Sequence, residues 1–158
     1  MSSPQPTIRR AQSVDLAVVR ALLKISGLPT TDLTSALDLQ LWVLENNESV
    51  FGVIGMERFG ACALLRSLAV GAGYQRRGFG RMLVARLERE AQTEGVLQLV
   101  LLTETAERFF HSIGYEVIDR RFAPEKIQQS AEFRSLCPAS AVCMTKFMAS
   151  SHAGVSHG

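Results

Sequence analysis

The sequence contains no long uninterrupted apolar run. Among its 158 residues, no stretch approaches the ~20 consecutive apolar residues that a membrane-spanning helix needs. The first residues, Met-Ser-Ser-Pro-Gln-Pro, lack the apolar core of a signal peptide. We therefore expect a cytoplasmic protein with no membrane partner, folded as a single domain.

Cysteine and net charge are both low. Cys62, Cys137 and Cys143 are odd in number and have no Cys-x-x-Cys spacing, so we expect neither a disulfide framework nor a metal site. The net charge of +2 is too small to indicate nucleic acid binding. The basic residues instead bunch in residues 76–89 and 120–134, which suits a local anion site.

The apolar pattern predicts alternating strands and helices. Strands are expected at 7–10, 39–44, 49–55, 61–70, 96–102, 115–118 and 141–144, and helices at 16–25, 32–39, 79–94 and 106–112. Residues 119–140 read as an irregular segment before the last strand. This order predicts an α/β fold around a mixed sheet, with a domain from 6 to 148 between disordered ends at 1–5 and 149–158.

A glycine- and arginine-rich turn follows the strand at 61–70. The run Gln75-Arg76-Arg77-Gly78-Phe79-Gly80-Arg81 opens a helix, where unpaired backbone N–H groups and the helix dipole favour an anion. Gly78 and Gly80 have no Cβ, so a ligand can approach the backbone closely. The spacing of a Walker loop is absent, and Leu83 stands where a dinucleotide fingerprint needs a small residue. The turn therefore predicts a different kind of pyrophosphate site.

Preceded by Leu68-Ala69-Val70, the pattern Gln75-x-x-Gly78-x-Gly80 resembles the acetyl-coenzyme A motif of the GNAT superfamily of N-acetyltransferases. The resemblance implies a GNAT fold, with helices on both faces of a mixed sheet that splays to hold acetyl-coenzyme A. It also implies a possible homodimer, since many members dimerise. It assigns cofactor binding to Leu68, Ala69, Val70, Gln75, Arg76, Arg77, Gly78, Phe79, Gly80 and Arg81.

The tyrosine that many members use to protonate the leaving thiolate is missing here. Their pattern A-x-x-F-Y-x-x-x-G-[FY] is matched at Ala106, Phe109, Gly114 and Tyr115, but the tyrosine position holds Phe110.

Other proton donors and acceptors are available in the sequence. Water, Tyr74, Tyr115 or His111 are alternative acids, and Glu104, at a strand end, is a candidate base acting through water. Both catalytic candidates also have plainer interpretations: His111 as a solvated histidine and Glu104 as a charge at a helix N-terminus.

Residues 101–115 are similar to the acetyltransferase domain of bacterial N-acetylglutamate synthases. Residues 64–70, 102–106 and 131–144 resemble, more closely, a GNAT group associated with arsenic resistance. Both resemblances imply an amino acid acceptor, whose carboxylate an arginine fork holds well. Substrate-binding candidates are Arg66, Ser67, Thr103, Arg134 and Ser140.

Arg66 also admits a second interpretation, as an arginine on a solvated strand face. Two alternatives to a small-molecule N-acetyltransferase stay open as well. One is a sensory module that binds acetyl-coenzyme A without catalysis, which Phe110 favours. The other is an enzyme that acetylates protein amines.

Overall fold

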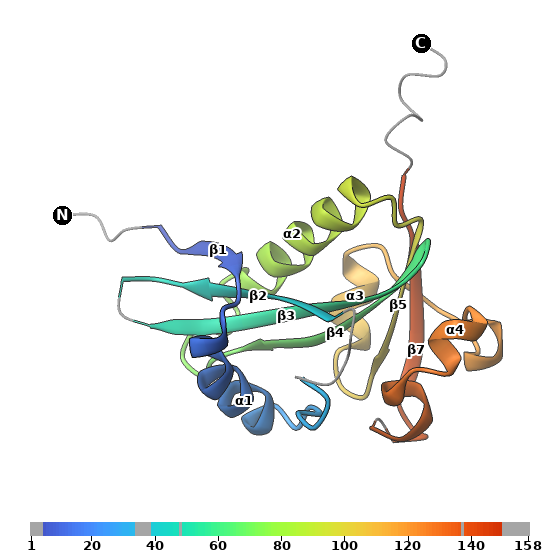
Figure 1. Ribbon diagram of the computed structural model, residues 1–158, viewed down its shortest axis with the longest axis horizontal. Helices are drawn as coiled ribbons and strands as arrows, with labels where there is room; N and C mark the ends of the chain where they lie inside the picture. Colours follow the sequence, from blue (N-terminus) through green and yellow to red (C-terminus); the bar gives the residue numbers. More distant parts are fainter. Residues whose placement is uncertain (1–4, 34–38, 48, 137, 150–158) are drawn as a thin grey trace, which may run out of the picture. The chain divides into compact units, whose positions relative to one another are not determined.

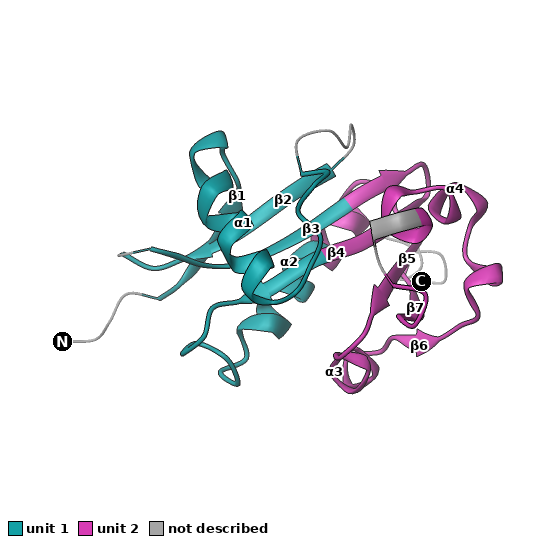
Figure 2. Ribbon diagram, turned by 90° about the horizontal axis from the view of Figure 1, so that it is seen from below, with its two compact units in different colours: residues 1–56, 67–87 teal, residues 57–66, 88–158 magenta. Residues whose placement is uncertain are grey.

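The computed structural model describes residues 5–33, 39–47, 49–136 and 138–149. The predicted disordered ends lie outside these ranges except for residues 5 and 149, and so does most of the predicted helix 32–39. The chain forms two compact units (Figure 2): unit 1 comprises residues 1–56 and 67–87, and unit 2 comprises residues 57–66 and 88–158. Two strands and one helix contribute residues to both.

In the described part of the chain, seven strands form one sheet of mixed direction, as the sequence predicted (Figure 1). Their order is β1-β2-β3-β4-β5-β7-β6. β4 and β5 pair in parallel, whereas β1–β2, β5–β7 and β6–β7 are antiparallel. The strands are β1 Thr7–Arg10, β2 Leu39–Glu45, β3 Val50–Phe59, β4 Cys62–Val70, β5 Gln98–Thr103, β6 Glu116–Val117 and β7 Val142–Phe147.

Among the residues that the structure describes, four α-helices and three shorter helical segments accompany the sheet. They are α1 Leu16–Ile25, α2 Phe79–Thr93, α3 Glu107–Ser112 and α4 Glu125–Gln128, with 3-10 turns η1 Ser13–Asp15 and η2 Arg120–Phe122 and a π-helical turn η3 Glu132–Leu136. The expectation of an irregular segment at 119–140 is therefore wrong for much of its length. Local capping explains part of the difference, since the Asp119 carboxylate accepts the Arg121 N–H at the start of η2 and Pro124 directly precedes α4.

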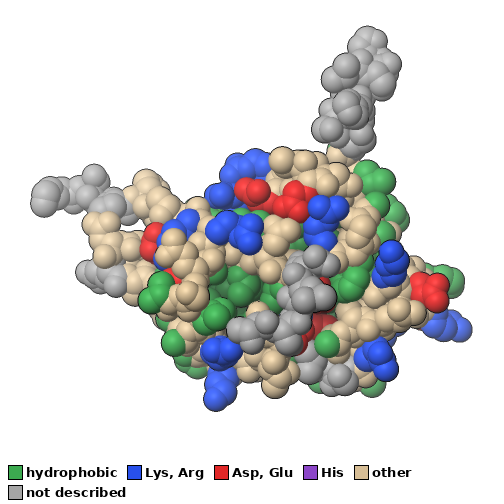
Figure 3. All heavy atoms as spheres, in the orientation of Figure 1, with side chains coloured by type: hydrophobic (Ala, Val, Ile, Leu, Met, Phe, Trp, Pro, Cys, Tyr) green, Lys and Arg blue, Asp and Glu red, His purple; other side chains and the backbone are tan. Residues whose placement is uncertain are grey.

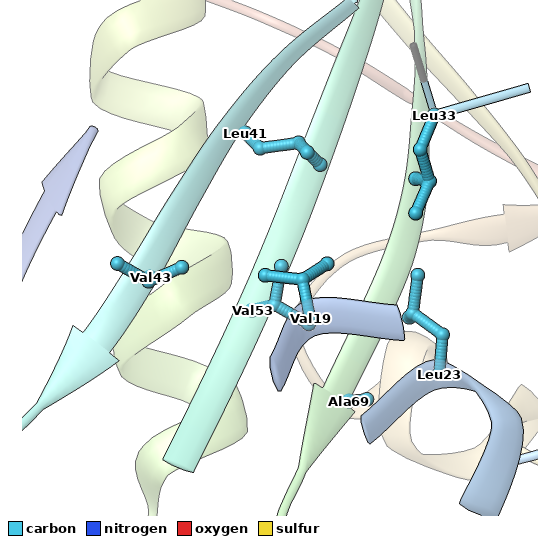
Figure 4. Close-up of a cluster of buried hydrophobic side chains, with 7 residues drawn as sticks. All are labelled: Val19, Leu23, Leu33, Leu41, Val43, Val53 and Ala69. Carbon is cyan, nitrogen blue, oxygen red and sulfur yellow. The ribbon is translucent and has the colours of Figure 1, made fainter. Parts of the chain in front are cut away.

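In unit 1, helices lie on both faces of the strands (Figure 1). The apolar face of α1 packs on β2, β3 and β4 in a buried cluster that Figure 4 shows, formed by Val19, Leu23, Leu33, Leu41, Val43, Val53 and Ala69. On the opposite face α2 approaches β3 closely: a Cβ on Gly52 would lie 3.2 Å from a Leu83 methyl carbon. The same Cβ would lie 3.2 Å from the Cβ of Leu44 on β2, so a larger residue at position 52 would require Leu44 and Leu83 to shift by a few tenths of an ångström.

In unit 2, α4 covers the sheet through Ile127, which packs with Leu64, Val100 and Cys143. The parallel register of β4 with β5 covers Cys62–Leu64 against Gln98–Val100. Within the described residues of unit 2, β4 continues through Arg66 and β5 through Thr103 beyond these register pairs.

An ion-pair cluster ties β1 to its neighbours in unit 1. The Arg9 guanidinium lies 2.8 Å from a carboxylate oxygen of Asp15 and 2.9 Å from one of Glu45. Asp15 also accepts the N–H of Gln12 at 2.7 Å, which fixes the entry to α1. The hydrogen bond from Arg9 lowers the pKa of the buried Asp15 carboxyl, and the Asp15 and Glu45 carboxylates raise the pKa of Arg9.

Candidate functional site

Hydrogen bonds hold the loop between β4 and α2 in place. The Gly71 N–H donates to the Phe51 carbonyl at 2.7 Å, and the Tyr74 N–H donates to the Gly71 carbonyl at 3.0 Å. The Gln75 side chain then reaches back to the last residue of β4, donating from Nε2 to the Val70 carbonyl at 3.1 Å. The loop is therefore held to the strand end that precedes it.

Aromatic side chains support the same loop. The rings of Phe51 and Tyr74 stack with centroids 4.1 Å apart, and Phe79 meets Phe51 edge-on at 5.1 Å. The Arg77 guanidinium lies over the Tyr74 ring at 5.8 Å. Offset and edge-on ring pairs add about 0.5–1.5 kcal/mol beyond area burial, so β3, the loop and the first residue of α2 are fixed together.

The backbone at the start of α2 presents N–H groups in an unusual geometry. Arg76 and Gly78 both have positive φ, at 65° and 84°, and α2 begins at Phe79. The Met82 N–H donates to the Gly78 carbonyl, whereas the earlier amides of a first turn have no intrahelical acceptor. A Cβ on Gly78 would meet nothing within 4 Å. This open, positively polarised backbone suits a pyrophosphate.

The cationic residues near the loop have different surroundings. Arg76, Arg77 and Arg81 are exposed around the start of α2. Further along the helix, the amphipathic pattern predicts a solvated face for both Arg86 and Arg89. Arg89 is exposed, but Arg86 is half-buried and donates to the Ile8 carbonyl at 3.1 Å. Over α2, basic and acidic side chains are interspersed in Figure 3. The exposed face of the helix is thus mixed in charge, whereas Arg76 and Arg77 lie in the loop before α2 and Arg81 lies in its first turn.

A second backbone irregularity occurs within β4, directly before the predicted cofactor-binding residues Leu68, Ala69 and Val70. Ser67 has φ 61° and is buried. A left-handed residue inside a strand reorients the peptides on either side of it, as a β-bulge does. The peptide amides that follow Ser67 are those that the sequence assigns to the acyl end of the cofactor.

Arg66 does not fit the solvated-face interpretation, because only 3% of it is exposed. Its guanidinium lies 3.2 Å from the Glu57 carboxylate and 3.5 Å from the Glu132 carboxylate. Glu132 is itself buried and belongs to η3. Arg66 thus joins β4 to β3 and η3, and acceptor binding by Arg66 would require these pairs to open.

The candidate base Glu104 and the substrate-binding candidate Ser140 are hydrogen-bonded to each other in unit 2. The Ser140 hydroxyl donates to the Glu104 carboxylate at 3.4 Å, and both residues are exposed. The Oγ1 atom of Thr103 accepts a hydrogen bond from the Ala106 N–H at 3.0 Å, so Thr103 stabilises the turn that precedes α3.

The other two candidates in this unit are exposed. His111 lies on α3, and Arg134 lies on the π-helical turn η3. The structure groups the residues predicted to bind the cofactor in unit 1 and, apart from Ser67 and Tyr74, the other candidates in unit 2.

Phe110 packs inside unit 2. Only 4% of it is exposed, and its ring lies edge-on to Tyr115 and Phe109 at 5.4 and 5.0 Å. Tyr115 is fully buried and donates to Glu88 at 2.8 Å. Burial and the Glu88 carboxylate raise the pKa of Tyr115. The suggestion that Tyr115 protonates a leaving group is therefore wrong, because its proton is held in this internal bond.

Two of the three cysteines, Cys62 and Cys143, lie among the described residues. Burial raises the pKa of Cys62, and it raises that of Cys143 to about 11, so neither thiol ionises readily. Cys137 lies outside the described residues. Among the side chains that the structure describes, no group of three or more His, Cys, Asp or Glu is arranged to hold a metal ion. No helix in the described part of the chain is long and apolar enough to cross a membrane.

Sequence reasoning missed the partners of two arginines, Arg66 and Arg120. Glu57 and Glu132 carry no motif, and their pairing with Arg66 depends on the tertiary fold. Arg120 was counted with a local anion site, yet its guanidinium donates to backbone carbonyls of its own chain. A signal existed for Arg66 alone, since a charge inside an apolar strand needs a partner if it is buried.

Comparison with known proteins gives a family. A family model described as the acetyltransferase (GNAT) domain matches residues 38–117. An uncharacterised N-acetyltransferase of Chlorobaculum tepidum is 35% identical over 81 residues, which is 51% of this chain and 50% of that protein. A probable N-acetyltransferase 14 of Danio rerio is 31% identical over 85 residues, which is 49% of this chain and 30% of that protein. The chain thus spans half or less of these curated relatives.

Solved structures share the fold at low identity. N-acetylglutamate synthase from Neisseria gonorrhoeae, complexed with coenzyme A and N-acetyl-glutamate, is 19% identical with a TM-score of 0.78, covering 94% of this chain and 36% of that one. Rv2747 from Mycobacterium tuberculosis, in complex with CoA, is 20% identical with a TM-score of 0.75, covering 90% of this chain and 99% of that one. The mixed sheet and its helices therefore match the fold of these proteins. Since the family model spans half of the chain, including the loop and the start of α2, the chain belongs to the GNAT acetyltransferase domain family.

Proposed function

We propose that this protein transfers the acetyl group of acetyl-coenzyme A to the amine of a small amino acid or an analogue of one. The observation that carries the proposal is the backbone from Arg76 to Gly78, which presents its amides in an open left-handed geometry at the start of α2. The pyrophosphate binds there, with Arg76, Arg77 and Arg81 adding charge.

The acyl end of the cofactor follows β4. The amides of Leu68 and Val70 bind the pantetheine and polarise the thioester carbonyl, in the manner of an oxyanion hole. The left-handed Ser67 reorients the peptide that enters this stretch. Attack by the neutral amine forms the C–N bond, the tetrahedral intermediate collapses with cleavage of the C–S bond, and the electron pair leaves on the thiolate.

The proton transfers in this reaction need little assistance from strong acids or bases. Glu104 takes the amine proton through water, and the Ser140 hydroxyl orients that carboxylate. The leaving thiol has an ordinary pKa of about 8.5, so the thiolate departs without a strong acid, and water protonates it. A phenylalanine at position 110 is compatible with turnover on this account.

The acceptor is an amino acid held by its carboxylate. Arg134 fits this role better than Arg66, because it is exposed on a π-helical turn whereas Arg66 is buried between two carboxylates. π-Helical turns are frequent at functional sites. Arg134 also lies within residues 131–144, which resemble the arsenic-associated GNAT group, so arsenical amino acid analogues belong among the acceptors.

The test is release of free coenzyme A from acetyl-coenzyme A with a panel of amino acids, including glutamate, glutamine and a glutamate-like arsenical. We expect at least one acceptor, and an Arg134→Ala variant with a KM for that acceptor raised about tenfold or more and an unchanged KM for acetyl-coenzyme A. Arg134→Lys should be nearly as harmful, because a point charge does not reproduce the guanidinium fork. Arg108→Ala, at an exposed arginine on α3, is the matched control.

Two results would favour the other functions. Tight binding of acetyl-coenzyme A with no release in the presence of any amine supports the sensory module. Release with peptides and with no amino acid supports an enzyme for protein amines.

A further inference from the structure

Arg120 reaches from η2 to the turn that precedes β7. Its Nη2 donates to the carbonyl oxygens of Pro138 at 2.7 Å and Ala141 at 3.1 Å. Its guanidinium also lies over the Phe133 ring at 5.9 Å. The side chain is half-buried. One arginine therefore contacts both η3, through Phe133, and the two ends of the turn at 138–141.

The turn held by Arg120 carries Ser140. The Ala141 N–H donates to the Pro138 carbonyl at 3.1 Å, which is the i to i+3 hydrogen bond of a β-turn. Ser140 is the third residue of this turn, and its hydroxyl reaches Glu104 at 3.4 Å. Glu104 follows the last residue of β5 directly. The position of the turn thus determines where the hydroxyl meets the carboxylate.

A guanidinium suits this task for a geometric reason. Its N–H groups lie in one plane and point in fixed directions, so a single group bridges two carbonyls and also stacks on an aromatic ring. A lysine ammonium in the same place offers a point charge with no preferred plane. The neighbouring Arg121 differs in burial and in its partner, because its side chain is 82% exposed and pairs with Asp119.

We infer that Arg120 is a positioning residue of the acceptor side: it fixes the 138–141 turn so that Ser140 orients the Glu104 carboxylate. The inference rests on the proposed function, in which Glu104 takes the amine proton. Arg120 touches neither substrate nor cofactor. It acts through Ser140 alone, which separates it from a residue that merely stabilises the fold.

A double-mutant cycle distinguishes a positioning role of Arg120 through Ser140 from a purely structural role. We expect Arg120→Lys and Ser140→Ala each to lower kcat/KM for the best amino acid acceptor by about tenfold, corresponding to one lost orienting hydrogen bond, while the KM for acetyl-coenzyme A stays within about twofold. The Arg120→Lys/Ser140→Ala double variant should be no worse than Ser140→Ala, because the two changes remove one function. Arg121→Lys is the matched control and should leave both constants unchanged. Effects that multiply in the double variant, or an unaltered acceptor kcat/KM in Arg120→Lys, would overturn the inference.

Amide hydrogen exchange provides a second test that does not depend on catalytic turnover. Arg120→Lys should speed exchange of the Ala141 amide several-fold, whereas Arg121→Lys should not, because only Arg120 bonds to both ends of the turn. Unchanged exchange of this amide in Arg120→Lys overturns the inference by itself. If the wild-type protein releases no coenzyme A with any amino acid, the proposed function fails, and the positioning of the turn is judged on exchange alone.

Discussion

The side-chain amide of Gln75 donates a hydrogen bond to the carbonyl oxygen of Val70, with 3.1 Å between nitrogen and oxygen. Val70 ends β4, and Gln75 lies within the loop that leads to α2. The bond therefore joins the strand that we propose to hold the acyl end of the cofactor to the loop that we propose to hold its pyrophosphate. A glutamine is suited to this role because it donates without adding a charge beside an anion site.

Replacing Gln75 by Glu should weaken coenzyme A binding about tenfold, or about 1.4 kcal/mol. The carboxylate cannot donate to the Val70 carbonyl, and it adds negative charge near the pyrophosphate. Isothermal titration calorimetry measures the change. Gln92→Glu is the control, since Gln92 also donates through Nε2 to a carbonyl, that of Ala149, but lies near the other end of α2. Equal losses in the two variants would contradict the role given to the loop.

Arg66→Met should destabilise the protein by about 3–5 kcal/mol, because it leaves the Glu57 and Glu132 carboxylates without their shared cation. Urea denaturation measures the loss, and a second change, Glu132→Gln, should restore part of it. Arg134→Met, at an exposed position, should change stability by less than about 0.5 kcal/mol. A fully stable Arg66→Met variant with a raised acceptor KM would show instead that Arg66 binds the substrate.

Phe110→Tyr should leave turnover within about one power of ten, because acid assistance to a thiolate of ordinary pKa contributes little. The same change should cost about 1–3 kcal/mol of stability, since the new hydroxyl enters a packed site beside Tyr115. Phe109→Tyr, at a half-buried position, is the control for adding a hydroxyl to α3. A rate increase of several powers of ten in Phe110→Tyr would identify the wild-type protein as the sensory module.

Stability should depend on pH through Asp15. The hydrogen bond from Arg9 lowers the pKa of this carboxyl in the folded protein below its ordinary value of 3.8. The ionised Asp15 carboxylate therefore stabilises the folded state fully above pH 3.8, and this stabilisation is lost as the pH falls through the pKa of the folded state. Asp15→Asn should therefore cost about 2 kcal/mol at pH 7 and little near pH 2. Denaturation of both proteins across this range checks the prediction, and a cost that does not vary with pH would refute it.

Local signals predicted the cofactor loop well. Glycine at 78, arginines around it and an apolar strand before it are sufficient to indicate a strand–turn–helix unit, and Gly95 ends α2 with φ 87° as expected. The left-handed backbone at Ser67 and Arg76 was not predictable in this way, since neither residue type favours it. Arg76 is among the residues that the family resemblance assigns to the cofactor, and Ser67, a substrate-binding candidate, directly precedes them; backbone strain is commonly found at functional sites.

The acceptor side was harder to predict because its contacts join distant segments. Arg66 meets Glu132, and Arg120 bonds to carbonyls that leave no mark on the sequence. The interpretation of residues 120–134 as an anion site failed for Arg120 and Arg121, both of which have partners within the chain. Burial and pairing of a charge are properties of the tertiary fold, and periodicity does not report them.

The central claim, that the pyrophosphate of acetyl-coenzyme A lies on the backbone at Gly78, is tested most directly by comparing Gly78→Ala with Gly95→Ala. These glycines flank α2, have φ of 84° and 87°, and would each place a Cβ in open space. Both variants should lose a similar ~1 kcal/mol of stability from left-handed strain. Calorimetric titration with coenzyme A should show at least tenfold weaker binding, about 1.4 kcal/mol, for Gly78→Ala and wild-type affinity for Gly95→Ala. Equal affinities in the two variants, or no binding to the wild-type protein, would contradict the account.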